Sequence, residues 1–175
     1  MTTAAWSVTE GAELRTFMRS WATGVAVVTG AVAGRAAGCT VNAFTSVSLD
    51  PPLLLVSLAT TSRTLAAVET TGVFGVNLLT RRQARLADRF AAPLPDRFAG
   101  VAHRMVDGVP VLDGALAAAT CTVARTIAVA DHVLVLGTPV RVGLRTDADP
   151  AVLFGGGYRA VDRLGLGDEP GGVPA

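Results

Sequence analysis

The helix-free stretch at residues 115–142 restricts the fold of this chain more than any other feature of its sequence. It contains two long runs of strand-forming residues, 115–129 and 132–142, joined across Ala130 and Asp131. Strands joined by so short a connection lie antiparallel, because a parallel pair needs a crossover, usually a helix. No strand ends in the glycine-rich fingerprint of a dinucleotide-binding parallel sheet. The stretch therefore favours a mainly antiparallel β fold.

Shorter strands and helices surround this hairpin in the predicted architecture. Apolar and β-branched runs predict strands at residues 25–29, 38–44, 53–58 and 73–79, and the glycines at 155–157 allow either close backbone approach to a ligand or a flexible turn. Helical spacing and capping residues predict helices that begin near Glu10, Ser62 and Thr80, and Gly72 is expected to end the second of them. With about six or seven strands, the predicted fold class is mainly β with peripheral helices, arranged as a closed or nearly closed antiparallel barrel.

Local patterns refine this architecture. Residues 31–37, beside two glycines, are expected to form a turn region, and residues 98–113 a loop-rich segment. Pro139 predicts an edge position or a β-bulge in the second long strand. In the first helix, apolar residues recur at helical spacing, so one face is expected to pack on the body of the chain: Leu14, Phe17, Met18 and Trp21.

The length of 175 residues fits one domain with a substantial core. We expect residues 1–9 to be a flexible lead, 10–163 a single domain, and 164–175, rich in glycine, proline and acidic residues, a disordered tail. Half of the residues are hydrophobic and only 17% are charged, so a second subunit is expected to cover apolar surface.

Charge and cysteine content exclude several classes of protein. The net charge of +1 gives no broad field to attract nucleic acid or an acidic membrane. No apolar run is long enough for a spanning helix, and the N-terminus lacks the pattern of a signal peptide. Cys39 and Cys121 do not make a disulfide framework or a metal-ligand spacing, so a reduced, cytoplasmic setting without a metal site is expected.

The segment 38–52 is dense in short, uncharged polar side chains and lies between apolar runs that are expected to be strands. Such groups on a rigid frame suit a flat ligand that makes many hydrogen bonds and carries no formal charge, and a flavin ring fits this description. The alternative is a plain hairpin closed by Asp50, Pro51 and Pro52, with its hydroxyls bonded to neighbouring backbone.

Three further places have both a functional and a structural interpretation. Residues 61–64 (Thr-Ser-Arg-Thr) begin a helix, where backbone N–H groups, hydroxyls and a guanidinium could hold a phosphate, or could form an ordinary N-cap. Gln83 has capping-box spacing from Thr80, and could also reach a ligand. His132 follows Asp131 between two strands, either as a turn residue or against an aromatic ligand at a barrel mouth.

The order and spacing of several motifs resemble the short-chain flavin reductases of the FMN-binding split-barrel superfamily, which are the reductase components of two-component flavin-dependent monooxygenases. The resemblance covers residues 14–161. Its motifs lie at residues 23–29, 40–52, 62–64, 72–79, 83–91, 97–100, 112–117, 131–132 and 157–158.

This resemblance implies a Greek-key-like, homodimeric split β-barrel with flavin held near the dimer interface. It implies that one group of residues lines the flavin ring and ribityl chain: Thr40, Val41, Asn42, Ala43, Ser46, Val56, Ser57 and Leu58. It implies that Ser62, Arg63 and Thr64 hold the phosphate, with Asn77 and Gln83 near the flavin tail. His132, with residues 154–158 including Gly157 and Tyr158, would seat the nicotinamide.

Two departures from the family pattern fall on the nicotinamide side. Ala130 stands where the family usually has glycine before Asp-His, and Phe154 and Gly156 stand where it often has tyrosine and arginine. The choice between NADH and NADPH is therefore left open by the sequence, as is that between FMN and FAD.

The expected function is that of an NAD(P)H:flavin oxidoreductase. Hydride passes from the nicotinamide to flavin N5, and the reduced FMN or FAD diffuses to a separate monooxygenase. Such a reaction needs stacking and orientation of two rings rather than an acid or base residue. The alternatives are a non-catalytic flavin-binding split barrel, or the same fold with a deazaflavin or a haem.

Overall fold

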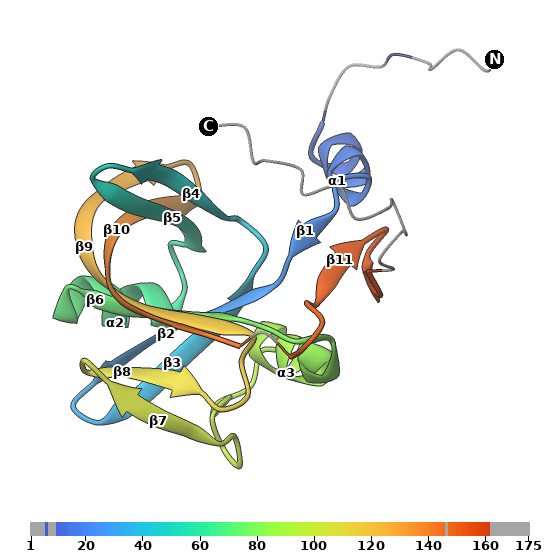
Figure 1. Cartoon of the computed structure of the whole chain (residues 1–175). Coiled ribbons are helices and arrows are strands. Elements are labelled where there is room, and N and C mark those ends of the chain that lie inside the picture. Colours follow the sequence, from blue (N-terminus) through green and yellow to red (C-terminus); the bar gives the residue numbers. More distant parts are fainter. Residues whose placement is uncertain (1–5, 7–9, 146, 162–175) are drawn as a thin grey trace.

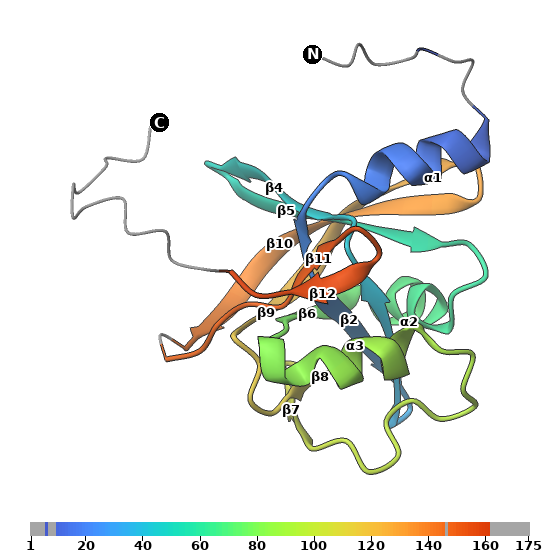
Figure 2. The same ribbon diagram turned by 90° about the vertical axis from the view of Figure 1, so that its right-hand side faces the viewer.

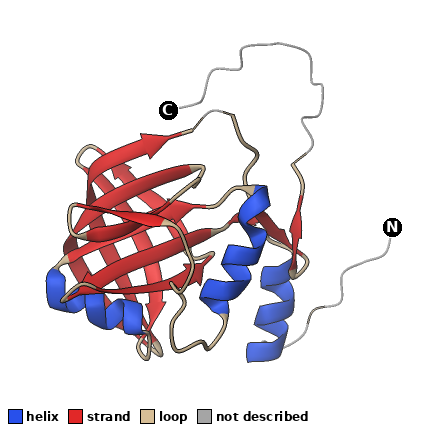
Figure 3. Ribbon diagram, turned by 90° about the horizontal axis from the view of Figure 1, so that it is seen from below, coloured by secondary structure: helices blue, strands red, loops and turns tan. Residues whose placement is uncertain are grey.

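The computed structural model describes residue 6 and residues 10–145 and 147–161. In this part the chain is mainly β, and the helices lie at the periphery of the strands (Figure 3). The helices are α1 Gly11–Arg19, α2 Arg63–Thr71 and α3 Ala84–Ala91, with the short 3-10 helix η1 at Arg81–Gln83. The strands are β1 Thr23–Gly24, β2 Ala26–Val32, β3 Arg35–Val41, β4 Phe44–Leu49, β5 Pro52–Ala59, β6 Val73–Leu78, β7 His103–Val106, β8 Val109–Leu112, β9 Ala117–Val129, β10 His132–Leu144, β11 Val152–Phe154 and β12 Gly157–Arg159.

One antiparallel sheet of seven strands dominates the described part, in the order β3-β2-β6-β9-β10-β5-β4. Figure 1 shows this sheet curling, so that hairpin β4–β5 lies above α2 and β6. The predicted hairpin of residues 115–142 is confirmed, because β9 and β10 pair from His132 opposite Val129 to Leu144 opposite Ala117. The antiparallel, mainly β architecture is therefore confirmed.

Pro139 lies beside a β-bulge, in a part of β10 that pairs only with β9 among the described strands. Strand β10 pairs with β5 only from His132 to Gly137, and its register against β9 shifts between Pro139 and Arg141, which leaves Val140 unpaired. Proline lacks the N–H that a ladder on both sides needs, so it occurs at free edges and beside bulges. Both predicted features of Pro139 are therefore found.

The core consists of two clusters on the two sides of the sheet. Phe74, Val56 and Val135 are fully buried in the first, and Phe90 and Leu79 in the second, beneath α3. Figure 2 shows α3 along the outside of the sheet, between hairpins β7–β8 and β11–β12. The first cluster packs the sheet against α2, and the second packs it against α3. These two helices position the polar groups described below.

The capping residues predicted for α2 and for the helix near Thr80 are confirmed. Ser62 caps α2 through its side chain, and Gly72 ends it with φ of 69°. Glycine adopts this left-handed conformation without the cost that a Cβ brings. Thr80 and Gln83 form the predicted capping box at η1, which leads into α3.

Two segments expected to be turns or loops are instead hairpins. Residues 31–37 are largely strand, since β2 and β3 are joined only by Ala33 and Gly34, both with positive φ. Residues 103–112 form hairpin β7–β8 around Asp107 and Gly108, also with positive φ. Asp-Gly typically marks a two-residue hairpin turn. The other glycines and the proline nearby instead suggested a loop-rich segment.

Helix α1 forms as predicted, but its expected packing on the body of the chain is wrong. It has no buried residue, and the side chain of Phe17 is 70% exposed. Figure 1 shows α1 standing outside the body of the sheet, to which it is joined through β1. The helical spacing of the apolar residues correctly predicted an apolar face on α1. It does not indicate whether the same chain or another one packs against that face.

The predicted lead 1–9 and tail 164–175 lie outside the described residues, except for Trp6. Among the described residues, no helix has the length and apolar character needed to cross a membrane.

Candidate functional site

A groove of about 340 Å³ lies where the ends of β3 and β5 meet the start of α2 and the start of β10. Its walls are mostly uncharged. The lining residues are Cys39, Thr40, Val41, Asn42, Ala43, Ser57, Leu58, Ala59, Thr61, Ser62, Arg97 and His132. Eight of them are among the residues predicted to bind a cofactor, so the structure brings half of the sixteen predicted residues into one place.

The β3 side of the groove is rigid. The backbone N–H of Ser57 donates to the carbonyl of Ala43 at 3.0 Å, which fixes the short link between β3 and β4 against β5. The hydroxyl of Thr40 donates to the carbonyl of Ala87 in α3 at 2.7 Å. The hydroxyl of Thr40 is therefore bonded to α3 and does not donate into the groove, whereas Asn42 and Ala43 are exposed at the groove.

Ser62 connects the groove to α2. Its Oγ accepts hydrogen bonds from the N–H groups of Thr64 and Leu65, at 3.2 and 3.5 Å. The N-cap interpretation of residues 61–64 is thus confirmed. The hydroxyl hydrogen of Ser62 points only to the Sγ of Cys39, at a long 3.8 Å. Within the described residues the buried Oγ1 of Thr64 has no hydrogen-bond partner.

His132 stands at the rim of the groove with its ring held by Asp131. Its Nδ1 lies 2.8 Å from Oδ1 of Asp131. This hydrogen bond holds the pKa of the Asp131 carboxyl below its usual range. The carbonyl of Asp131 accepts from the N–H and the hydroxyl of Thr60, which ties the β9–β10 turn to the end of β5. The other ring nitrogen of His132, Nε2, takes no part in the hydrogen bond to Asp131.

Several predicted residues lie outside the groove. Val56 is fully buried in the core, and Ser46 is exposed on β4. The guanidinium of Arg63 donates to the carbonyls of Leu94 and Pro95 and lines a second cavity.

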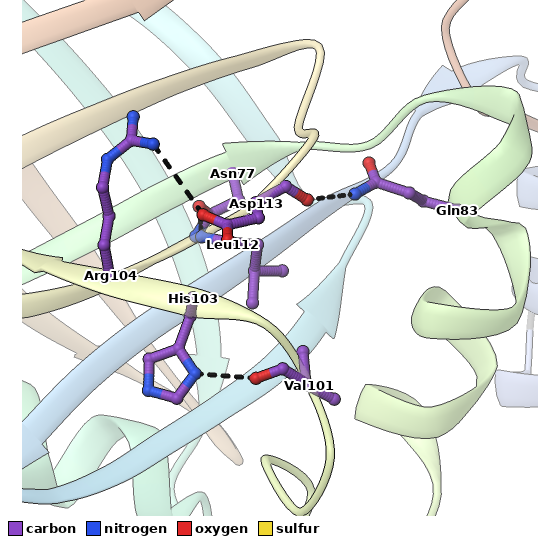
Figure 4. Close-up of polar contacts among 7 residues, drawn as sticks. All are labelled: Asn77, Gln83, Val101, His103, Arg104, Leu112 and Asp113. Carbon is purple, nitrogen blue, oxygen red and sulfur yellow. Dashed lines mark hydrogen bonds and ion pairs between the residues drawn. The ribbon is translucent and has the colours of Figure 1, made fainter.

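The side-chain amides of Asn77 and Gln83 form hydrogen bonds that join strands and loops (Figure 4). Oδ1 of Asn77 accepts from the N–H of Leu112 at 2.8 Å, and its Nδ2 donates to the carbonyl of Val27 at 3.1 Å. Oε1 of Gln83 accepts from the N–H of Thr80, and its Nε2 donates to the carbonyl of Asp113 at 2.9 Å. Neither residue lines the groove.

Gly157 and Tyr158 lie on β12, in a separate three-stranded sheet with β1 and β11. The phenol of Tyr158 donates to the carboxylate of Asp88 in α3 at 3.1 Å. Burial, together with this carboxylate, raises the pKa of Tyr158 to about 12. Neither residue lines the groove in one chain. The described residues contain no group of three or more His, Cys, Asp or Glu side chains placed to hold a metal ion.

Arg97 is a lining residue that the sequence did not point to. Its Nε donates to the carbonyl of Ala92 and its Nη1 to the carbonyl of Gly38, both at 2.8 Å. The segment 97–100 carried part of the family resemblance, but no spacing rule connects it with residue 40. Cys39 and Ala59 were not predicted, although each adjoins a predicted residue in the chain, whereas Thr61 belongs to the segment 61–64 that could hold a phosphate.

A family model described as "Flavin reductase like domain" matches residues 18–162. The chain belongs to the flavin reductase-like family. The match confirms the resemblance seen in residues 14–161.

Curated members of the flavin reductase-like family are similar over most of this chain. An "NADH-dependent flavin reductase" of Rhodococcus is 39% identical over 164 residues, which are 91% of this chain and 90% of the relative. A "probable flavin reductase" of Rhizobium meliloti is 44% identical over 126 residues; these are 71% of this chain but only 40% of that longer relative. The reductase subunit HsaB of a flavin-dependent monooxygenase from Mycobacterium tuberculosis is 36% identical over 124 residues, covering 70% of this chain and 66% of HsaB.

Solved structures of flavin reductases share the fold of this flavin reductase-like chain. The NADH:FAD oxidoreductase SgcE6 from Streptomyces globisporus, in complex with NAD and FAD fragments, superposes with a TM-score of 0.86. The sequences are 29% identical, and the match covers 91% of this chain and 99% of SgcE6.

Proposed function

We propose that this chain is an NAD(P)H-dependent flavin reductase, the reductase component of a two-component flavin-dependent monooxygenase. The observation that carries the proposal is the groove between β3, β5 and α2, whose uncharged hydroxyls, amide and backbone suit a flavin ring. Family membership and the activities of the relatives support the reaction. FMN or FAD is the flavin substrate, NADH or NADPH the donor, and the reduced flavin passes to a separate oxygenase.

The residues of the groove fit a flavin. Asn42, Ser57 and Thr61 offer neutral donors and acceptors, and among the residues that the structure describes no carboxylate lines the groove. Beside it, the buried hydroxyl of Thr64 has no partner in the described residues, at a helix start that suits a phosphate. The bound flavin supplies the chemistry by accepting hydride from the reduced nicotinamide at N5.

The contribution of the chain is to bind, orient and exclude water. Val41 and Leu58 are buried at the groove and offer an apolar surface to one side of a flat ring. The hydrogen bond from the N–H of Ser57 to the carbonyl of Ala43 holds the polar edge in place. His132, fixed by Asp131, presents Nε2 to the donor nucleotide. Positioning of this kind lowers the barrier without a proton-transfer residue.

We propose that the chain forms a homodimeric split barrel, in which residues 10–163 form a single domain. The support is apolar surface that one chain leaves exposed, which includes Leu49, Leu144, Phe17 and Trp21. A small cavity of about 320 Å³ lies beside Trp21 and Phe44, and Asn42 borders both it and the groove. A second copy covering this region would complete one wall of the flavin site. Light scattering of the purified protein tests this, and a monomer at micromolar concentration would contradict it.

Oxidation of NADH and NADPH, assayed in parallel with FMN, FAD and riboflavin, tests the proposed reaction. We expect nucleotide oxidation that depends on added flavin. Flavin that binds without being bleached by either nucleotide would instead identify a non-catalytic flavin-binding protein.

Reactivity of Cys39 gives a test of where flavin binds. Cys39 lines the groove, whereas Cys121 is 1% exposed and burial raises the pKa of its thiol to about 12. We expect a thiol-reactive disulfide reagent to label one cysteine in the folded protein, and Cys39→Ser to abolish the labelling. Saturating FMN is expected to slow the reaction at least about tenfold, because the ring covers the thiol. An unchanged rate with FMN would place the flavin elsewhere.

Replacement of His132 tests its role in seating the donor. We expect His132→Asn to raise the KM for the nicotinamide nucleotide about tenfold, the loss of roughly 1.4 kcal/mol of binding. The Kd for FMN, measured by fluorescence quenching in the same variant, serves as the internal control and is expected to stay within about twofold. Loss of FMN binding with an unchanged KM would assign His132 to the flavin instead.

A further inference from the structure

The loop between α3 and β7 begins with residues that are not part of the core. Pro93, Leu94 and Pro95 are all exposed, whereas Phe98, further along the loop, is only 8% exposed. We refer to residues 93–95 as the loop tip. A segment without buried apolar side chains keeps a fixed position only through its polar contacts, and it is released when these contacts break.

One arginine of α2 supplies the polar contacts of the loop tip. The guanidinium of Arg63 donates through Nη1 to the carbonyl of Pro95 and through Nη2 to the carbonyl of Leu94. The N–H of Leu94 bonds within the loop, to the carbonyl of Ala92 at 2.9 Å. Among the described residues, no other hydrogen bond joins the loop tip to another element. The position of the loop tip therefore depends on Arg63.

The rest of the loop is anchored without Arg63. Arg89 of α3 donates to the carbonyls of Arg97 and Ala99, both at 2.7 Å. Arg97 in turn donates to the carbonyl of Gly38 on β3 at 2.8 Å. Loss of the Arg63 contact would therefore free the loop tip while residues 97–99 keep their place.

The loop partners of Arg63 are neutral carbonyls, so the contact is open to exchange. The guanidinium forms no ion pair with another described residue. A hydrogen bond from a guanidinium to a phosphate is charge-assisted and roughly twice as strong as one to a neutral acceptor. The planar fork that reaches two carbonyls also fits two oxygens of a phosphate. A phosphate within reach of Arg63 would thus draw the guanidinium away from the loop tip.

The start of α2 is the place where a phosphate would come within reach. Ser62, next to Arg63 in the chain, lines the groove. The helix start suits an anion, and the hydroxyl of Thr64 is buried there without a partner among the described residues. Arg63 itself lines the second cavity together with Pro95. Arg63 is therefore adjacent to both the proposed phosphate position and the loop tip.

We propose that Arg63 is a phosphate-responsive latch for the loop tip. It holds the loop tip in the arrangement that the structure shows, and a phosphate bound beside Ser62 draws its guanidinium away and releases the loop tip. This inference rests on the proposed function, because the phosphate is that of FMN or FAD. Riboflavin carries no phosphate and leaves the latch closed.

The latch favours departure of the flavin. Binding of the phosphate breaks the contact between Arg63 and the loop tip, so the free energy of that contact is subtracted from the affinity for FMN. Return of Arg63 to the loop tip restores the contact when the flavin leaves. This exchange suits a reductase whose reduced flavin passes to a separate oxygenase.

A nitroxide label on the loop tip reports its release. Leu94→Cys keeps the backbone carbonyl that Arg63 holds, and the side chain at this position is exposed. The label is attached in a Cys39→Ser background, where the remaining cysteine, Cys121, is only 1% exposed. Electron paramagnetic resonance line shapes then give the mobility of the label with FMN, riboflavin or NAD+ added in turn.

We expect saturating FMN to shorten the rotational correlation time of the label at least about twofold, and riboflavin to leave it unchanged. Arg63→Ala is expected to give the mobile spectrum before any flavin is added, with no further change on adding FMN. The matched control is Arg85→Ala on α3, which also removes an exposed arginine but lines neither the groove nor the second cavity. It is expected to respond to FMN as the parent does.

A double substitution tests the latch with both native cysteines in place. Pro93 and Pro95 restrict the backbone of the loop tip, so Pro93→Gly/Pro95→Gly raises the entropy cost of holding the loop tip on Arg63. The loop tip then competes less strongly for the guanidinium. We expect the Kd for FMN, measured by fluorescence quenching, to fall about fivefold, and that for riboflavin to stay within about twofold.

The outcomes separate this inference from the proposed function. Release by FMN but not by riboflavin, lost in Arg63→Ala, supports the latch. Release by NAD+ without flavin would overturn the flavin phosphate as its trigger. An immobile loop tip in Arg63→Ala, equal effects of FMN and riboflavin, or an unchanged Kd for FMN in Pro93→Gly/Pro95→Gly overturns the latch and, with normal FMN binding, leaves the reductase proposal intact. Failure of the wild-type chain to bind FMN or riboflavin would overturn both.

Discussion

Replacing Ala43 with tryptophan is expected to weaken FMN binding by at least about 100-fold, or roughly 2.8 kcal/mol. Ala43 is exposed at the groove, and its carbonyl is fixed by the N–H of Ser57 at 3.0 Å. The backbone therefore cannot swing away to make room, and an indole ring at this position occupies the space that a flavin ring needs. Fluorescence titration with FMN and riboflavin measures the effect.

Ala99→Trp is the matched control for this substitution. Ala99 is also an exposed alanine whose backbone is held, since its N–H donates to Asp96 and its carbonyl accepts from Arg89, but it lines neither cavity. We expect normal FMN affinity in Ala99→Trp. Tight FMN binding by folded Ala43→Trp, shown by an unchanged melting temperature, would refute the assignment of the groove to the flavin.

Asn77→Ala is expected to lower the free energy of unfolding by about 2–4 kcal/mol. Asn77 is fully buried, and its amide joins β6 to β2 and to β8 through Val27 and Leu112. Alanine removes these bonds and leaves the N–H of Leu112 and the carbonyl of Val27 without their side-chain partner. Urea unfolding followed by circular dichroism gives the free energy, provided that the transition is two-state.

Asn42→Ala is expected to affect FMN binding rather than stability. Asn42 is exposed at the groove, so we expect its replacement to change the unfolding free energy by less than about 0.5 kcal/mol but to weaken FMN binding. Asn77→Ala is expected to keep the FMN affinity of the wild type wherever it remains folded. If Asn77→Ala instead weakened FMN binding without loss of stability, the prediction that Asn77 lies near the flavin tail would be supported.

The elements that the sequence predicted well are those set by local chemistry. Ser62 and Gly72 bound α2, and Thr80 with Gln83 begins η1, because capping depends on residues three or four positions apart. The β9–β10 hairpin followed from two long strand-forming runs and the short link between them. The Asp107–Gly108 turn was equally local, and it was missed because the surrounding glycines suggested an irregular loop.

What the sequence could not give depends on contacts between distant residues. Arg63 is predicted as a phosphate ligand beside Ser62, and the contact of its guanidinium with the carbonyls of Leu94 and Pro95 could not be foreseen from the chain. Arg97 enters the groove only because it spans from Ala92 to Gly38. The apolar face of α1 was correctly identified, yet nothing along the chain says whether this chain or a second copy covers it.

The pairing of β10 limits how this scaffold could be redesigned. His132 lies opposite both Val129 and Ala59, and it is the first residue of its strand. Side chains alternate between the two faces of a strand, so inserting one residue between His132 and the irregularity at Leu136 and Gly137 would send the imidazole to the opposite face. Inserting two would restore its direction but move it, together with Asp131, along the strand and away from the rim. A designer who wishes to change donor preference therefore has to keep the number of residues between that turn and the irregularity, and has to keep Asp131 as the partner of His132.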